Sequence, residues 1–182
     1  MRASLRTIAC ALAGAIATAC NATGGAPDFT LRDDAGTAWS LSQQRGTAVL
    51  LTFGFTHCAD TCPMTLAKLA RVARAQRKPA RPIEVAFVTV DPKRDTVAVM
   101  HRFVGRFTEP RDDDVVGLTG TFAQIARVKA AYHVWSQPLR NGDIAHTAVI
   151  VLIDARGRIA GTFDDDESQA SLSHAISATL TS

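Results

Sequence analysis

Two cysteines separated by three residues, Cys58 and Cys62, are the residues of this chain best suited to chemistry. They follow a short apolar run over 48–53, which predicts a buried strand, and precede a stretch from Thr65 whose apolar residues recur at helical spacing. Residues four apart share a helix face, so both sulfurs can converge on one point. A helix N-terminus also favours thiolate, the form that attacks disulfides and binds soft metals. The pair therefore predicts thiol redox chemistry, a metal site or both.

A structural disulfide is the simplest alternative for this pair. A disulfide stabilises most when it closes a long loop, and a bridge between Cys58 and Cys62 would enclose only three residues. The other two cysteines, Cys10 and Cys20, both lie within the first 20 residues. A reactive or metal-binding pair is thus the stronger prediction.

The first 20 residues predict an export signal of the lipoprotein type. Two arginines precede an uninterrupted run of small and apolar residues over 7–19, which is short for a membrane span. Ala17 and Ala19 suit ordinary signal cleavage, whereas Cys20 resembles the acylated cysteine of a bacterial lipoprotein. Either reading predicts an exported protein, tethered by lipid in the second case.

Residues 21–27, with two glycines and a proline, are expected to form a flexible linker, and residues 28–182 a single folded domain. Removal of the first 19 residues takes away Arg2 and Arg6, so the formal charge falls from +3 to +1. No run of basic residues interleaved with aromatics appears in the remainder, which argues against nucleic-acid binding.

Strands and helices alternate along the domain, which then ends in a hairpin and a helix. The predicted elements are a hairpin over 29–39, a strand over 48–53, a helix to about 77, a strand over 83–90, a helix capped by Asp95 or Thr96, a strand over 115–118, a helix over 121–131, an extended segment over 132–135, strands over 146–154 and 159–163, and a helix starting at Asp166 or Ser168. This order predicts an α/β fold: a thioredoxin-like three-layer sandwich with a central mixed β-sheet and an added N-terminal β-hairpin.

The predicted topology gathers residues that are distant in sequence. The two parallel strands end at one edge of the sheet, which carries the cysteine loop and Asp91. The strand expected to begin at His146 runs antiparallel to them, so it starts at the same edge. Cys58, Cys62, Asp91 and His146 are therefore predicted to meet there.

Four segments, in order along 27–180, resemble the Sco/SenC family. They are Gly54-Phe55-Thr56-His57-Cys58-Ala59-Asp60-Thr61-Cys62-Pro63, Val90-Asp91-Pro92-Lys93-Arg94-Asp95-Thr96, Gly117-Leu118-Thr119-Gly120 and His146-Thr147-Ala148. The resemblance implies a thioredoxin-like metallochaperone outside the cytoplasmic membrane. Such a protein binds copper through two cysteines and a histidine and delivers it to a terminal (cytochrome c) oxidase during assembly.

The family's copper ligands carry over to Cys58, Cys62 and His146, and Asp91 matches its Asp-Pro loop. Ala59 departs from the proline that commonly follows the first cysteine, which would loosen the loop without removing a ligand. The copper would be carried as Cu(I) or as Cu(II). The chemistry agrees, because soft thiolates and imidazole suit Cu(I), whereas structural zinc would need a fourth ligand. Loading requires the reduced dithiol.

The resemblance also implies partners and a location. A terminal oxidase subunit would accept the copper, and a periplasmic copper donor or thiol reductant would act upstream. The expected place is the periplasmic side of the bacterial cytoplasmic membrane, with lipid on Cys20 as the anchor, or the soluble periplasm if the signal is simply cleaved.

Several neighbouring residues have secondary roles in this interpretation. Asp60, between the cysteines, either tunes their charge or is a solvated loop acid. Asp91 either fixes its own loop or acts behind the ligands. Met64 offers a thioether beside the site, although a helix methionine more often faces the core. His57 is adjacent to Cys58 and is expected to point away from the ligands.

A thiol–disulfide oxidoreductase is the main alternative function, with Cys58 attacking and Cys62 resolving. The three-residue spacing differs from the Cys-x2-Cys of general oxidoreductases. Thr147 and Ala148 also stand where thioredoxins have their substrate-clamping cis-proline. A thiol peroxidase is a third possibility, but its chemistry gives no reason for His146 to lie opposite the dithiol. A copper-dependent redox sensor would use the same ligands as a copper carrier. Copper carriage, with no enzymatic activity required, remains the leading prediction.

Overall fold

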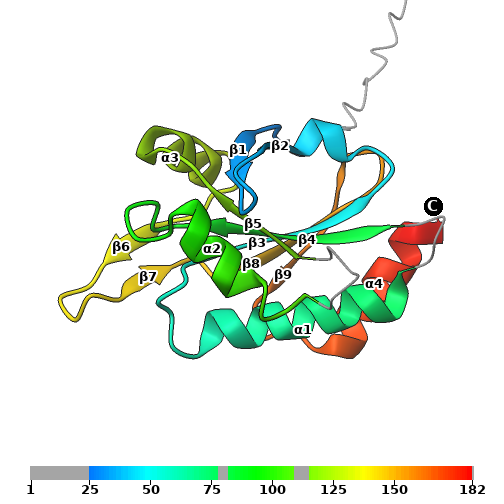
Figure 1. The fold of residues 1–182 in the computed structure, drawn as a ribbon. Coiled ribbons are helices and arrows are strands. Elements are labelled where there is room, and N and C mark those ends of the chain that lie inside the picture. Colours follow the sequence, from blue (N-terminus) through cyan, green and yellow to red (C-terminus); the bar gives the residue numbers. More distant parts are fainter. Residues whose placement is uncertain (1–24, 78–81, 109–114, 182) are drawn as a thin grey trace, which may run out of the picture.

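A seven-stranded mixed sheet organises the molecule (Figure 1). The computed structural model describes residues 25–77, 82–108 and 115–181, so the predicted export signal and most of the predicted linker lie outside the described residues. The elements are β1 Thr30–Asp33, β2 Ala38–Ser40, the 3-10 helix η1 Leu41–Gln44, β3 Ala48–Gly54, α1 Thr61–Gln76, β4 Ile83–Thr89, α2 Val97–Val104, β5 Val115–Thr119, α3 Phe122–Ala131, β6 Ser136–Pro138, β7 Ile144–His146, β8 Val149–Ile153, β9 Ile159–Asp164 and α4 Gln169–Thr181. Among the described residues, no helix is long and apolar enough to cross a membrane.

The strand order is β2-β1-β5-β4-β3-β8-β9. The strands β3, β4 and β5 run parallel to one another. Strand β8 is antiparallel to β3, and β9 is antiparallel to β8. Strand β1 is antiparallel to β5 and forms a hairpin with β2. Helices α1 and α4 pack together on one side of the sheet, and α3 lies on the other (Figure 1). The predicted thioredoxin-like sandwich with its mixed sheet and N-terminal hairpin is confirmed.

The centre of the sheet follows directly from the sequence. Every residue of β3 is buried, and β4 is buried throughout except at Glu84, as expected for strands covered on both faces. The helix starts also agree with capping chemistry. Thr96 accepts a hydrogen bond from the Val99 N–H, and Thr121 forms a reciprocal capping box with Gln124. The buried strands β3 and β4 thus end at the same edge of the sheet.

The region before β8 differs from the prediction in two places. The expected single strand over 146–154 is two strands, because β7 ends at His146 and β8 begins at Val149. The extended segment over 132–135 is also wrong, since the chain turns after α3 and His133 has a left-handed φ of 56°. Instead β6 starts at Ser136 and pairs with β7 in a separate two-stranded sheet.

Hydrogen bonds made by Thr147, which follows His146, explain why β7 and β8 are separate strands. The Thr147 N–H donates to the Trp135 carbonyl, and the Thr147 hydroxyl accepts from the Trp135 N–H. This segment therefore pairs with the residue before β6, and the register with β3 begins only at Ile150. His146 consequently lies at the end of a hairpin strand and not at the start of a strand of the main sheet.

Glu84 links the N-terminal hairpin to β4 and makes stability depend on pH. Trp39 Nε1 donates to its carboxylate at 3.0 Å, and burial raises the pKa of Glu84 from 4.5 to about 7. The folded state therefore binds more protons than the unfolded state between these values, and stability falls as pH rises through that window. Because the side chain is partly exposed and solvent screens its interactions, we expect a loss of about 2 kcal/mol.

Urea unfolding at pH 4.5 and pH 8, followed by tryptophan fluorescence, measures this dependence. Glu84→Gln keeps an oxygen for Trp39 but does not titrate, so its unfolding free energy should lack the decline. Equal declines in the two proteins would show that another group is responsible.

Candidate metal centre

The cysteine loop connects the end of β3 to the start of α1. Cys58 is partly exposed in this loop, and Cys62, the second residue of α1, is only 5% exposed. The Cys62 N–H donates to Cys58 Sγ at 3.3 Å. The two cysteines therefore lie at the beginning of a helix, with the Cys58 sulfur against the Cys62 backbone.

His146 approaches the same point from the β6–β7 hairpin. Its Nε2 lies 3.9 Å from Cys62 Sγ, and its Nδ1 lies 3.0 Å from the Thr147 carbonyl oxygen. Since a carbonyl only accepts, Nδ1 carries the proton and Nε2 presents its lone pair to the sulfur. The Phe55 ring supports the imidazole edge-on, with ring centroids 6.0 Å apart. Sulfur and nitrogen donors are thus brought together from positions 84 residues apart.

Cys62 is the central member of this arrangement, because it alone contacts both other residues. Within residues 25–77, 82–108 and 115–181, no three His, Cys, Asp or Glu side chains lie close enough together to hold an ion as placed. Cys58 and His146 are on different loops and both are partly exposed. Closing three donors around one ion therefore requires these two side chains to move toward Cys62.

Burial controls the proton affinity of Cys62. It raises the pKa of the Cys62 thiol, as does the hydrogen bond with Cys58, while a backbone hydrogen bond at Phe55 acts in the opposite direction. The sequence prediction that the helix N-terminus would favour thiolate is therefore wrong for Cys62, because desolvation of the charge outweighs the macrodipole. A soft cation bound to the sulfur would replace the proton and compensate the negative charge of the buried thiolate.

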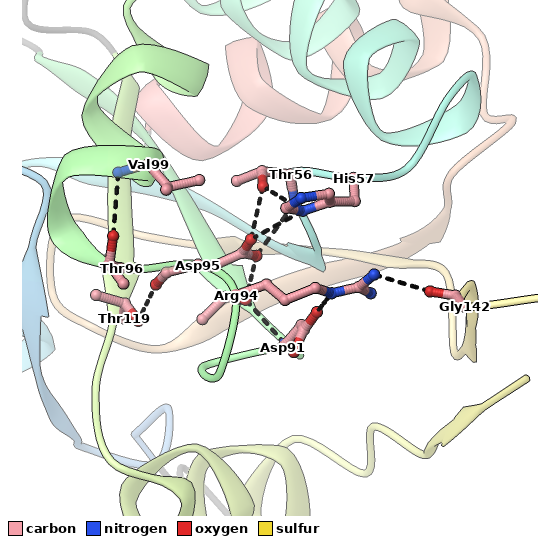
Figure 2. A network of polar contacts seen from close by, with 10 residues as sticks. Thr56, His57, Asp91, Arg94, Asp95, Thr96, Val99, Thr119 and Gly142 are labelled. Carbon is pink, nitrogen blue, oxygen red and sulfur yellow. Dashed lines mark hydrogen bonds and ion pairs between the residues drawn. The ribbon is translucent and has the colours of Figure 1, made fainter.

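A buried carboxylate that the sequence did not reveal fastens the cysteine loop to the end of β4. Asp95 is fully buried and accepts hydrogen bonds from the Thr56 N–H at 3.1 Å and from the Thr56 and Thr89 hydroxyls, each at 2.6 Å (Figure 2). His57 Nδ1 lies 3.8 Å from the same carboxylate. The sequence offered Asp95 only as a possible helix cap, a role that Thr96 takes.

The remaining candidate residues are Asp91, Asp60 and Met64. Asp91 is buried, and its carboxylate accepts from Arg94 Nε (Figure 2). Asp60 is the exposed N-cap residue of α1 and makes no side-chain capping bond. Met64 does not face the core, as helix methionines commonly do, but is 71% exposed. Roles for Asp60 and Asp91 behind the ligands remain predictions.

Gly54 leaves the space into which the Cys62 sulfur packs. A Cβ at this position would lie 2.8 Å from Cys62 Sγ and 2.7 Å from the Phe87 ring. Gly54→Ala should therefore displace Cys62, reducing stability by about 2 kcal/mol and copper affinity about tenfold. Chelator competition with Cu(I) and urea unfolding measure the two effects.

Gly117→Ala is the matched control for Gly54→Ala. Its Cβ would press on Val104 and Met100, at 3.0 and 3.1 Å, in the part of the sheet covered by α2. It should lose stability but keep the copper affinity of the wild type. An equal loss of copper affinity in both variants would mean that general overpacking, and not the position of Cys62, is responsible.

Comparison with known proteins identifies the family. A family model described as SCO1/SenC matches residues 18–181. The chain belongs to the SCO1/SenC family. The resemblance predicted from the four sequence segments is therefore confirmed.

Relatives of this Sco/SenC domain occur in bacteria and eukaryotes. The mitochondrial protein SCO2 homolog of Homo sapiens is 35% identical over 159 residues, covering 84% of this chain and 58% of that protein. The copper-bound structure of ScoI from Bradyrhizobium japonicum is similar at 34% identity with a TM-score of 0.73, covering 86% of this chain and all of that one. The copper-bound structure of Arabidopsis thaliana ScoI has 27% identity and a TM-score of 0.78, covering 87% and 99%. The chain spans about half the length of the first curated relatives that it matches.

Proposed function

We propose that this Sco/SenC domain is a copper carrier that binds copper through Cys58, Cys62 and His146 and delivers it to the copper centre of a terminal (cytochrome c) oxidase during assembly. The observation that carries the proposal is the position of Cys62, whose N–H donates to Cys58 Sγ at 3.3 Å and whose Sγ lies 3.9 Å from His146 Nε2. The two copper-bound ScoI structures support it, since this chain shares their fold and family.

Two sulfurs and one imidazole nitrogen form a donor set suited to copper. Thiolates are soft ligands that favour Cu(I), and imidazole also binds Cu(II). The Nδ1–H···O=C bond to Thr147 holds the His146 ring in the tautomer whose Nε2 is free to ligate. Both thiols must lose their protons when metal binds, so copper uptake releases protons and weakens at low pH.

The unequal burial of the donors suits a carrier. Cys62 is buried and would retain the ion, whereas Cys58 and His146 are partly exposed and open to the ligands of an acceptor. Exchange at the exposed donors first and at Cys62 last would move copper stepwise without releasing it to water. The partially exposed side of the site would thus face the oxidase subunit.

The partners and location follow from the same proposal. A periplasmic copper donor or thiol reductant would act before loading, because a Cys58–Cys62 disulfide would exclude the ion. The export signal over 1–20 would place the domain on the periplasmic side of the bacterial membrane, anchored by lipid on Cys20. The human relative is described as mitochondrial.

A dedicated thiol–disulfide reductase is the second candidate function. The closeness of the two free cysteines favours it, since Cys58 Sγ accepts from the Cys62 N–H at 3.3 Å and neighbouring thiols can exchange with a disulfide of a partner. In that role Cys58, the more exposed sulfur, would attack, and Cys62 would resolve the mixed disulfide. The oxidase copper site would be the substrate, reduced before it is metallated.

An anaerobic Cu(I) titration distinguishes the two functions. The reduced domain from Asn21 onward is titrated against a competing chelator, with His146→Ala in parallel. We expect one tightly held copper per wild-type chain, with about tenfold weaker Cu(I) binding and a larger loss for Cu(II) in His146→Ala, since nitrogen matters more to Cu(II). Weak binding by wild type with both thiols confirmed as reduced would contradict the carrier and favour the reductase.

A further inference from the structure

The short loop between β4 and α2 contacts both segments that carry the proposed ligands. Asp95 in this loop holds the Thr56 end of the cysteine loop, and Arg94 reaches the opposite way, to the β6–β7 hairpin (Figure 2). We propose that Arg94 is a positioning residue, whose side chain fixes the hairpin that carries His146 relative to the cysteine loop. The inference deepens the proposed copper function, although its geometric part stands without it.

Arg94 makes three contacts that point in different directions. Its Nε donates to the Asp91 carboxylate, and its Nη1 donates to the Gly142 carbonyl at 2.9 Å. Its guanidinium also lies over the Phe55 ring, 5.7 Å from the centroid. Asp91, at the end of β4, thus orients the Arg94 side chain, and the Arg94 guanidinium in turn holds the Gly142 carbonyl. Phe55 is the first residue after β3, so all three segments around the site meet at one guanidinium.

The hairpin depends on such contacts because it lies outside the main sheet. Among the described residues, strands β6 and β7 pair only with each other, and they project from the body of the molecule (Figure 1). The bonds between Trp135 and Thr147 hold its base. Gly142 lies in the turn at its other end, so the Arg94 bond is a second point of attachment. A strand held at both ends has a defined position, and His146 is the last residue of β7.

The Phe55 ring connects the Arg94 guanidinium to the imidazole of His146. Phe55 lies beneath the guanidinium on one side and meets the His146 imidazole edge-on, with centroids 6.0 Å apart. Arg94 therefore acts on His146 in two ways: through the backbone of the hairpin and through Phe55. Loss of the guanidinium would leave the imidazole position less defined relative to Cys62 Sγ.

Arginine is required at this position and lysine is not an equivalent. The guanidinium is planar and presents several donors in fixed directions, so it can serve a carboxylate and a carbonyl while stacking on a ring. A lysine ammonium is a point charge that can pair with Asp91 without reaching Gly142 or covering Phe55. Arg94→Lys therefore keeps the charge of the loop and removes the bridge.

Hydrogen exchange measured by mass spectrometry tests the geometric part without copper. In both Arg94→Ala and Arg94→Lys, amides over 136–147 should exchange about tenfold faster than in wild type, while those of β3 and β4 keep their rates. Lys93→Ala is the control, since it removes an exposed positive charge from the same loop. Unchanged exchange over 136–147 in both Arg94 variants would overturn the proposal.

Copper spectroscopy tests the consequence for the ligand. Cu(II) bound to Arg94→Lys should show altered electron paramagnetic resonance parameters and about tenfold lower affinity, with Cu(I) affinity changed less because the thiolates remain. Wild-type spectra and affinities in Arg94→Lys would contradict the positioning role. Failure of wild type itself to bind copper would instead refute the carrier function, and faster exchange over 136–147 would still support the role of Arg94 in the fold.

Discussion

Cys62→Ser is expected to lower the affinity of the reduced domain for Cu(I) on the order of a thousandfold. Removal of residues behind a ligand typically costs 10–100-fold in metal affinity, and loss of a soft ligand from a three-donor site exceeds this. Cys62 is the donor in contact with both other candidates, so its loss leaves Cys58 and His146 without a shared neighbour. Anaerobic competition against a Cu(I) chelator measures the change.

Two comparisons make the result specific to the sulfur. Cys58→Ser should also abolish tight binding, because a single thiolate with one imidazole is a poor cuprous site. Thr61→Ser, in the same first turn of α1, removes only a methyl group beside the cavity that Cys62 lines and should bind as wild type does. A Cys62→Ser protein that keeps its secondary structure and binds Cu(I) normally would refute the proposed site.

The sequence was most informative where local pattern and topology agree. Apolar runs predicted β3 and β4, and parallel strands end at one edge of a sheet, which placed Cys58 and Cys62 near His146. The 3.9 Å separation between Cys62 Sγ and His146 Nε2 bears out that argument. It succeeded although the strand start was misplaced, because β8 begins only three residues after His146 and runs antiparallel to β3 as expected.

The same pattern could not locate the break between β7 and β8. Residues 147–153 are all either apolar or β-branched, so nothing local distinguishes two strands from one. The Trp135–Thr147 pairing that ends β7 is a tertiary interaction. The proton affinity of Cys62 was missed for a related reason. A helix start is visible in sequence, whereas burial, which dominates here, depends on side chains from several elements.

Asp95 shows most clearly what sequence alone leaves hidden. An aspartate just before a helix is usually a cap, and only the folded chain reveals its carboxylate turned inward to Thr56 and Thr89. Asp95→Ala would leave one buried N–H and two hydroxyls without their acceptor. We therefore expect it to lower the free energy of unfolding by about 3 kcal/mol or more.

Asp95→Asn should have an intermediate effect, for a reason of hydrogen-bond polarity. The Asn oxygen can still accept from the Thr56 N–H and the Thr89 hydroxyl, and the Asn amide can donate to the Thr56 hydroxyl, which rotates to suit. The loss is then the charge assistance of those bonds, about 1–2 kcal/mol. Urea unfolding followed by tryptophan fluorescence measures all variants on one scale.

Asp60→Ala is the matched control, since it removes an exposed carboxylate from the cysteine loop itself. It should change the unfolding free energy by less than about 0.5 kcal/mol. Because Asp95 holds the loop that carries Cys58, Asp95→Ala should also speed amide exchange over 54–58, whereas Asp60→Ala should not. Equal stability of the Asp95→Ala and Asp60→Ala proteins would show that the buried network does not hold the cysteine loop in place.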